Sequence, residues 1–244
     1  MFAHVTLRVS DRGHSEHFYR TVLSSLGISP THERDDVLAW DDFALLAADD
    51  AHPPTQHLHA GFVARSRAEV RTFWETGIAA GFADAGEPRE RRQYRPDYYG
   101  AFLLDPDGNS IEAVHHGDTR GGGHIDHLWL GVSDLDAAQC FYTTISRFTG
   151  LRAGRRWEHG VQFAGAWATF SLVADGRPVT TGCHLAFPSP DRQAVREFHR
   201  AAVNAGYRDH GEPGERPQYG DGYFAAYVLD PDGTNVECVH RGAG

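Results

Sequence analysis

Apolar and polar residues alternate at the start of the chain, where every second residue of 4–9 from position 5 onwards is apolar. A period of two residues predicts a β-strand that buries one face. The apolar residues that follow recur at intervals of three and four, which predicts a helix capped by Ser10 or Asp11 and ended by Gly27. The chain is therefore expected to open with a strand and a helix.

Two short β-like runs come next, at residues 37–40 and 43–47, and the order of elements then begins again. Residues 59–64 alternate like the first strand, and Ser66 with Glu69 forms a capping-box pattern that predicts the start of a second helix. Each pass through this order predicts one β-α-β-β-β module.

The second half of the chain repeats the first. Residues 2–11 match 125–134, and residues 93–112 match 218–237, with related residue types at corresponding positions. An internal repeat that runs nearly end to end indicates a duplicated domain. The sequence therefore predicts an α+β protein built from four βαβββ modules.

The two copies are joined by a polar, glycine-rich stretch that we interpret as a linker. This places the first domain at residues 1–117, the linker at 118–123 and the second domain at 124–244. In the second copy, Ser189 followed by Pro190 at the first helical position is the predicted start of the last helix.

Composition limits the partners. The chain has 244 residues and a formal net charge of −10, from 33 acidic and 23 basic residues, which disfavours nucleic acid and anionic membranes. No apolar run is long enough to span a bilayer, and a strand at residues 2–9 leaves no room for a signal peptide, so we expect a cytoplasmic protein. Three cysteines without a pairing pattern predict free thiols.

Both copies share a turn that leads to a glutamate. The tetrapeptide Asp-Pro-Asp-Gly, at residues 105–108 and 230–233, has the residue preferences of a type I turn. In the strand that follows each turn, Glu112 and Glu237 lie on the face opposite the apolar residues. A carboxylate within an apolar strand needs a cation, a metal or water as its partner.

Histidines stand at or near the start of the first strand of each module, on the same polar face as the glutamates. We expect these faces to meet on the concave side of a curled sheet, because helices cover the apolar faces. Two imidazoles and one carboxylate favour a borderline divalent metal and leave positions open for water, substrate or dioxygen. The predicted triads are His4, His59 and Glu112 in the first half, and His127, His184 and Glu237 in the second.

Some neighbouring residues compete for these roles. His57 shares a strand face with His59, but its counterpart in the second copy is Gly182, which favours His59 as the ligand. Cys183 and Cys238 are chain neighbours of ligands and alternate to the other face, so we do not expect a thiolate ligand or nucleophile.

These features resemble a tandem member of the vicinal oxygen chelate (VOC) superfamily, which groups glyoxalases, bleomycin-resistance proteins and extradiol dioxygenases. The resemblance rests on the matched histidines and on the Asp-Pro-Asp-Gly-x-x-x-Glu ending, each present in both copies. It implies two domains of paired βαβββ modules, each a curled mixed sheet with helices outside. It also implies that the same six residues bind a divalent metal, with Fe(II) favoured over Mn, Ni or Zn. The implied partner is a small-molecule substrate, with a homodimer as one possible assembly.

Within this superfamily, the favoured interpretation is an extradiol-type dioxygenase that acts on an aromatic diol. Such enzymes end in a pattern like Tyr-x-x-Asp-Pro-x-Gly-x-x-x-Glu, which residues 227–237 fit, whereas Phe102 replaces the tyrosine in the first copy. Gln218 and Tyr219 stand where that family has an acid–base histidine. The resemblance therefore makes Tyr219, Tyr223 and Tyr227 the candidate catalytic residues.

Other activities stay open. A glyoxalase-like isomerase or lyase usually adds a second glutamate from the last strand of its first module, and neither residues 43–48 nor residues 169–174 contain one, which argues against glyoxalase I itself. An antibiotic-modifying thiol transferase with two histidines and one glutamate is an alternative. A metal-free protein that sequesters a drug is another, and metal content would separate it from the enzymes.

Substrate-binding candidates flank the predicted triads. Trp129 and Arg8 follow the first histidine of each copy on the same strand face, and suit a flat aromatic ligand and an anionic one respectively. Tyr94 and Tyr98 lie in a loop that approaches the glutamate hairpin. Because Trp129 and Tyr227 both belong to the second half, we expect the site of that half to be the better oxygenase candidate.

Overall fold

The β-α-β-β-β order occurs four times in the computed structural model, which describes residues 1–117 and 122–242, so the predicted α+β class and modular order are confirmed. The first module consists of β1 (His4–Val9), α1 (Arg12–Ser24), β2 (His32–Glu33), β3 (Val37–Trp40) and β4 (Phe43–Ala47). The second consists of β5 (Leu58–Val63), α2 (Arg67–Ala79), β6 (Ala83–Glu90), β7 (Tyr99–Leu104) and β8 (Ser110–His115). The third consists of β9 (Ile125–Gly131), α3 (Leu135–Thr149), β10 (Arg152–Trp157), β11 (Gly160–Ala164) and β12 (Thr169–Val173). The fourth consists of β13 (Cys183–Pro188), α4 (Arg192–Asn204), β14 (Arg208–Glu215), the short 3-10 helix η1 (Pro217–Tyr219), β15 (Tyr223–Leu229) and β16 (Asn235–Arg241).

Two local features differ from the sequence prediction. Strand β2 was not expected, because both of its residues are exposed and it carries no apolar alternation. Helix α4 does not begin at Ser189 and Pro190 but after Asp191, whose carboxylate accepts a hydrogen bond from the backbone N–H of Ala194 at 2.8 Å. That bond satisfies one of the free amides of the first turn, so the aspartate sets the helix start.

The strands form two mixed eight-stranded sheets, in the orders β14-β15-β16-β13-β1-β4-β3-β2 and β10-β11-β12-β9-β5-β8-β7-β6. In each sheet the glutamate strand runs parallel to a histidine strand, β16 beside β13 and β8 beside β5. Alternate residues on neighbouring strands share a face, so each pair presents its histidine and glutamate on the same side.

The chain divides into two compact units. Unit 1 comprises residues 1–5 and 130–244, and unit 2 comprises residues 6–129. In unit 1 the N-terminal residues lie beside β13, where the Ala3 N–H donates to the Ala186 carbonyl at 2.8 Å. The domain division at residues 118–123 stays a prediction, since residues 118–121 of that segment lie outside the described part.

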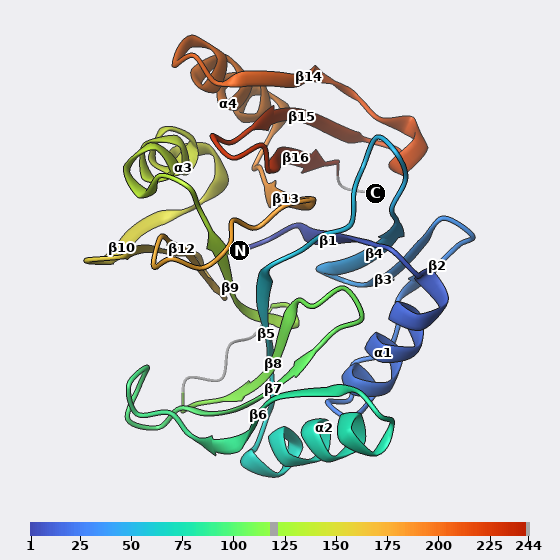
Figure 1. Cartoon of the computed structure of the whole chain (residues 1–244). Helices are drawn as coiled ribbons and strands as arrows, with labels where there is room; N and C mark the ends of the chain where they lie inside the picture. The colour runs from blue at the N-terminus through green and yellow to red at the C-terminus, as the bar shows by residue number, and fades with distance from the viewer. Residues whose placement is uncertain (118–121, 243–244) are drawn as a thin grey trace. The chain divides into compact units, whose positions relative to one another are not determined.

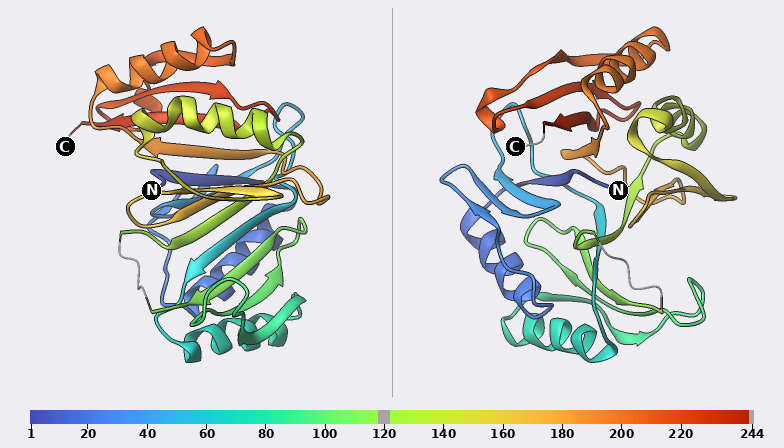
Figure 2. Two further views of the ribbon diagram at one scale, coloured as in Figure 1. Left: turned by 90° about the vertical axis from the view of Figure 1, so that its left-hand side faces the viewer. Right: turned by 180° about the vertical axis from the view of Figure 1, so that it is seen from behind.

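Helices cover one face of the strands in each unit. Helix α2 packs on β6, β7 and β8 and also contacts α1 in unit 2, and α4 packs on β14, β15 and β16 and contacts α3 in unit 1 (Figures 1 and 2). The inward stripe of α4 consists of Val195, Phe198 and Ala202, all fully buried as predicted. Because the helices occupy the apolar faces, the polar faces of the same strands are left for the histidines and glutamates.

The Asp-Pro-Asp-Gly turns are held by their first aspartate. The N–H of Gly233 closes the second turn on the carbonyl of Asp230 at 3.0 Å. The Asp230 side chain accepts hydrogen bonds from the N–H of Thr234 at 2.8 Å and from the Tyr142 hydroxyl at 3.0 Å. Asp105 bonds Tyr19 in the same way at 2.8 Å. A buried aspartate therefore fastens each turn to the helix that covers it.

Replacing Asp230 with asparagine should change how the stability of the protein depends on pH. Burial raises the pKa of Asp230 from 3.8 to about 6, so the folded protein binds this proton more tightly than the unfolded chain. The stability that Asp230 contributes when protonated is therefore lost as the pH rises through about 4 to 6. Relative to Asp230→Asn, the wild type should lose on the order of 2 kcal/mol of unfolding free energy between pH 4 and pH 7. Urea unfolding of both proteins at the two pH values measures this loss. If the difference in unfolding free energy between wild type and Asp230→Asn were the same at both, the raised pKa of Asp230 would be contradicted.

Candidate metal centres

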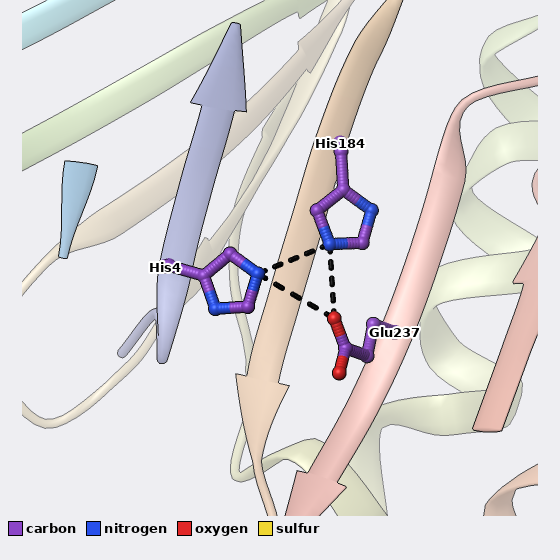
Figure 3. Close-up of side chains that lie close together, drawn as sticks. All are labelled: His4, His184 and Glu237. Atoms are coloured by element: carbon purple, nitrogen blue, oxygen red, sulfur yellow. Dashed lines mark hydrogen bonds and ion pairs between the residues drawn. The ribbon is translucent and has the colours of Figure 1, made fainter. Parts of the chain in front are cut away.

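In unit 1, His4, His184 and Glu237 converge from three neighbouring strands, β1, β13 and β16 (Figure 3). His4 Nε2 lies 3.2 Å from His184 Nε2 and 3.5 Å from Glu237 Oε2, and His184 Nε2 lies 2.9 Å from the same oxygen. The glutamate is buried and the two imidazoles are partly exposed. We call this group the terminal triad.

In unit 2, His59, Glu112 and His127 form an equivalent group on β5, β8 and β9. His59 Nε2 lies 3.0 Å from His127 Nε2 and 3.2 Å from Glu112 Oε2, and His127 Nε2 lies 3.3 Å from that oxygen. Glu112 and His127 are buried, and His59 is partly exposed. We call this group the central triad.

Both triads fit a divalent metal ion. Two ligands bound at about 2.1 Å lie about 3.0 Å apart at a right angle and about 3.4 Å apart at a tetrahedral angle. The donor separations in the two triads run from 2.9 to 3.5 Å, which matches this range. Each triad offers two imidazole nitrogens and one carboxylate oxygen from the protein, so further coordination positions would stay available to water or substrate.

The predicted grouping of the six ligands by chain half is wrong. His4 joins His184 and Glu237 from the second half, and His127 joins His59 and Glu112 from the first. The reason is the order of strands, because β1 lies beside β13 and β9 lies beside β5. The sequence prediction paired consecutive modules, whereas each triad draws its first histidine from the other copy.

A tyrosine holds each glutamate from behind. The hydroxyl of Tyr98 donates to Glu112 Oε1 at 2.8 Å, and that of Tyr223 donates to Glu237 Oε1 at 2.7 Å. Burial would raise the pKa of Glu112, but hydrogen bonds from His127 and His59 outweigh it and lower that pKa below its usual value. The same balance, with His184, lowers the pKa of Glu237. Both carboxylates are therefore ionised, with Oε2 turned toward the histidines.

One imidazole in each triad, His127 and His4, has a shifted pKa. Burial disfavours a charged His127, yet hydrogen bonds to Asp126 and Glu112 raise its pKa to about 9. Burial and the adjacent His184 lower the pKa of His4 to about 3, against the attraction of Glu237. Near neutral pH, His127 is therefore protonated on both ring nitrogens and positively charged, whereas His4 is neutral.

The aromatic candidates are divided between the triads. Trp129 lies edge-on to His59, with ring centroids 6.1 Å apart, and contacts Tyr94 at 5.9 Å. Tyr227 lies 6.3 Å from His184. The prediction that Trp129 and Tyr227 flank one metal in the second half is therefore wrong, because they lie beside different triads. Arg8 donates to the carbonyl of Ala47 at 2.9 Å.

The remaining candidates lie beside these residues. Tyr94 and Tyr219 are about half exposed, at 43% and 58%, and each ring packs 5.2 Å from the tyrosine that holds the glutamate. Phe102 occupies the position in unit 2 that corresponds to Tyr227 in unit 1, and its ring centroid lies 5.7 Å from that of His59. Tyr94 and Tyr219 therefore leave ring surface exposed beside the tyrosines that hold the glutamates.

Comparisons with known proteins agree with this architecture. Residues 124–238 match the sequence model of the Glyoxalase/Bleomycin resistance protein/Dioxygenase superfamily. The match covers the second half of the chain, which carries a domain of this superfamily. A relative in Bacillus subtilis (strain 168), the uncharacterised protein YqjT, is 26% identical over 124 residues, which are 47% of this chain and 97% of that protein.

Two solved structures share this fold over nearly the whole chain. Glyoxalase I from Zea mays superposes with a TM-score of 0.71 at 19% identity, over 98% of this chain and 92% of the maize chain. A candidate dioxygenase from Bacillus subtilis subsp. subtilis str. 168 gives a TM-score of 0.68 at 16% identity, over 100% and 86% of the two chains. At this identity the likeness shows the fold alone.

The cysteines and His57 belong to neither triad. Cys183 and Cys238 are buried, and burial raises the pKa of the Cys238 thiol to about 12. His57 precedes β5 with a positive φ of 61°, and His59 rather than His57 joins the metal-ligand group.

No helix in the described part of the chain combines the length and apolarity needed to cross a bilayer.

Sequence reasoning missed the residues that support the ligands. Asp126, buried beside His127, and His116, buried at the end of β8, are hydrogen-bonded to each other at 2.8 Å. Ser110 lies 3.0 Å from Nδ1 of His59. The sequence did contain one indication: directly before the histidine that both copies share, the first copy has Ala3 and the second has Asp126.

Proposed function

We propose that this superfamily member is a metal-dependent enzyme of extradiol-dioxygenase type that acts on an aromatic diol, with its oxygenase site at the central triad. The observation that carries the proposal is the set of two imidazoles and one carboxylate, converging at 2.9 to 3.5 Å in each unit. This ligand set with open positions is typical of non-haem Fe(II) oxygenases. Bound there, a metal would supply Lewis-acid activation of two adjacent oxygens and a docking position for dioxygen.

The chain's own residues would bind and orient the ring. Trp129 and Phe102 lie beside His59, and Tyr94 packs on Trp129, which together offer aromatic surface that favours a flat substrate. Tyr98 keeps Glu112 in place by its hydrogen bond to Oε1, which leaves Oε2 for the metal. The pKa of Tyr98 is raised by burial and by Glu112, so its hydroxyl keeps its proton and serves as a donor.

Glyoxalase I chemistry is less well supported. The last strands of the first and third modules, β4 and β12, carry no glutamate, although glyoxalase-like enzymes usually draw an additional ligand from that position. A non-redox thiol transferase needs only the three ligands present. The place of the dioxygenase acid–base histidine is taken by Gln218 and Tyr219, and this observation keeps the thiol transferase as the second candidate.

Oxygen uptake by the Fe(II)-loaded protein tests the proposal. Extradiol cleavage breaks the ring carbon–carbon bond next to the diol and places both atoms of one O₂ in the product, so uptake should equal the diol consumed. The protein is reconstituted anaerobically and assayed with a panel of catechols as wild type, His59→Ala and His184→Ala. We expect uptake to fall to background in His59→Ala and to persist in His184→Ala, because Trp129 flanks His59.

Other results would redirect the assignment. Loss of uptake in His184→Ala alone would move the oxygenase site to the terminal triad. If every catechol is inert and Mn(II), Ni(II) or Zn(II) supports thiol addition or isomerisation, the non-redox alternative replaces the oxygenase. A wild type that retains no metal after reconstitution would favour a drug-sequestering protein.

A further inference from the structure

The two triads present the same three ligands but rest on different supports. The residue before the first histidine is Asp126 in the central triad and Ala3 in the terminal triad. A histidine near the end of each glutamate strand, His115 or His240, is followed by His116 in the first copy and by Arg241 in the second copy. The duplication has therefore diverged at the positions that hold the ligands, although it has kept the ligands themselves.

Around the central triad, a buried carboxylate links two histidines. Asp126 Oδ1 lies 2.9 Å from Nδ1 of His127, and Asp126 Oδ2 lies 2.8 Å from Nε2 of His116. Asp126 and His116 are 4% and 6% exposed. Because Asp126 occupies the hydrogen-bonding position at Nδ1 of His127, Nε2 is the nitrogen that faces the other ligands and is left to bind a metal.

The same network reaches the glutamate ligand. The ring of His116 is stacked with that of Tyr98, at 6.2 Å between centroids and an interplanar angle of 27°. Tyr98 in turn donates to Glu112 Oε1 at 2.8 Å. The second histidine ligand, His59, has Ser110 Oγ at 3.0 Å from its Nδ1. All three ligands of the central triad are thus fixed by a polar group on the side away from the metal position.

The histidines of the terminal triad lack such support. In the described part of the chain, Nδ1 of His4 and Nδ1 of His184 are buried without a hydrogen-bond partner. Ala3 and Ala186 belong instead to an apolar cluster with Ala225. Both rings are therefore held by polar contacts on the Nε2 side alone, where a metal would bind, and no outer hydrogen bond to Nδ1 orients them among the described residues.

From this contrast we infer that Asp126, held by His116, is a positioning residue that makes the central triad the tighter of the two metal sites. The inference rests on the proposed metal dependence and adds an order of loading: a divalent ion occupies the central triad first. Outer hydrogen bonds of this kind typically change metal affinity by about 10- to 100-fold. The difference between the triads should fall in that range.

Titrations with Zn(II) against a chelator of known affinity, and with Co(II) followed by its visible absorption, test the inference. Glu237→Gln disables the terminal triad and Glu112→Gln the central one, so each single variant reports on one site. We expect Zn(II) to bind Glu237→Gln about 10- to 100-fold more tightly than it binds Glu112→Gln. This comparison leaves Asp126 unchanged.

A second pair of variants addresses Asp126 itself. In the Glu237→Gln background, Asp126→Ala should weaken Zn(II) binding by about 10- to 100-fold and alter the Co(II) spectrum, and Asp126→Asn, which keeps an acceptor oxygen, should weaken it less. In the Glu112→Gln background, Asp126→Ala should leave the Zn(II) affinity of the terminal triad unchanged. A purely structural Asp126 would lower thermal stability and leave the Zn(II) affinity of the folded protein unaltered.

The outcomes separate the two hypotheses. Equal Zn(II) affinity in Glu237→Gln and Glu112→Gln, with no effect of either Asp126 substitution, overturns the inference and leaves a metal-dependent function standing. A wild type that binds neither Zn(II) nor Co(II) overturns the proposed function as well.

Discussion

Combining Glu112→Gln with His127→Ala should cost the protein one bound metal ion per chain, whereas combining Glu237→Gln with His127→Ala should cost it two. The first pair damages the central triad twice, and the second pair damages both triads, because His127 lies 3.3 Å from Glu112 Oε2 in unit 2. Elemental analysis after reconstitution with Zn(II) and removal of free metal measures the stoichiometry. The wild type, with two complete triads, should retain about two ions.

The reciprocal pairs serve as controls. Glu237→Gln with His4→Ala should again remove one ion, and Glu112→Gln with His4→Ala should remove two, since His4 lies 3.5 Å from Glu237 Oε2. If ligands were grouped by chain half instead, Glu237→Gln with His127→Ala would leave one ion bound. Circular dichroism of each variant separates loss of metal from loss of fold, because the glutamates lie on the face opposite the helices.

Gly61→Ala should weaken metal binding at the central triad by about tenfold or more. A Cβ atom at Gly61 would lie 2.6 Å from Nδ1 and 2.9 Å from Nε2 of His127 and would also meet Cε1 of that ring. His127 is buried and bonded to Asp126, so it cannot move aside without losing that bond or its place near the metal. The Zn(II) titration in the Glu237→Gln background measures the loss.

The second copy supplies a matched control for this substitution. Ala186 of unit 1 is the counterpart of Gly61, and it lies within the apolar cluster that includes Ala225. Ala186→Gly in the Glu112→Gln background should therefore change the Zn(II) affinity of the terminal triad by no more than about twofold, because it removes only a methyl group and leaves all three candidate ligands in place. An equally large effect of both substitutions would show that neither acts through His127.

The sequence predicts much of this fold because the duplication repeats each local signal. The alternation in β1, the Asp-Pro-Asp-Gly turns and the glutamate that follows them depend on neighbouring residues, so each can be recognised from a short window. The start of α4 escaped recognition because Ser189 and Asp191 are both good caps two residues apart. Only the Asp191 carboxylate bonds the first turn.

The partners of His4 and His127 could not be predicted in the same way. Chain order suggests that consecutive modules share a site, but pairing of β1 beside β13 and β9 beside β5 depends on contacts between distant segments. The predicted strand faces place all six side chains in groups that could hold a metal, while their grouping required the order of strands in the sheet. Asp126 escaped notice because an aspartate beside a histidine carries no periodic signal of its own.

The separation of the ligands along the chain has a consequence for biosynthesis. In the central triad His59 and His127 are 68 positions apart, whereas in the terminal triad His4 and His184 are 180 positions apart. Closing a longer loop costs more chain entropy and slows folding, and a growing polypeptide exposes its residues to solvent in order. The central triad can therefore assemble while the ribosome is still adding the second half. The terminal triad cannot form until Glu237 has been translated, and until then His4 is free to make non-native contacts.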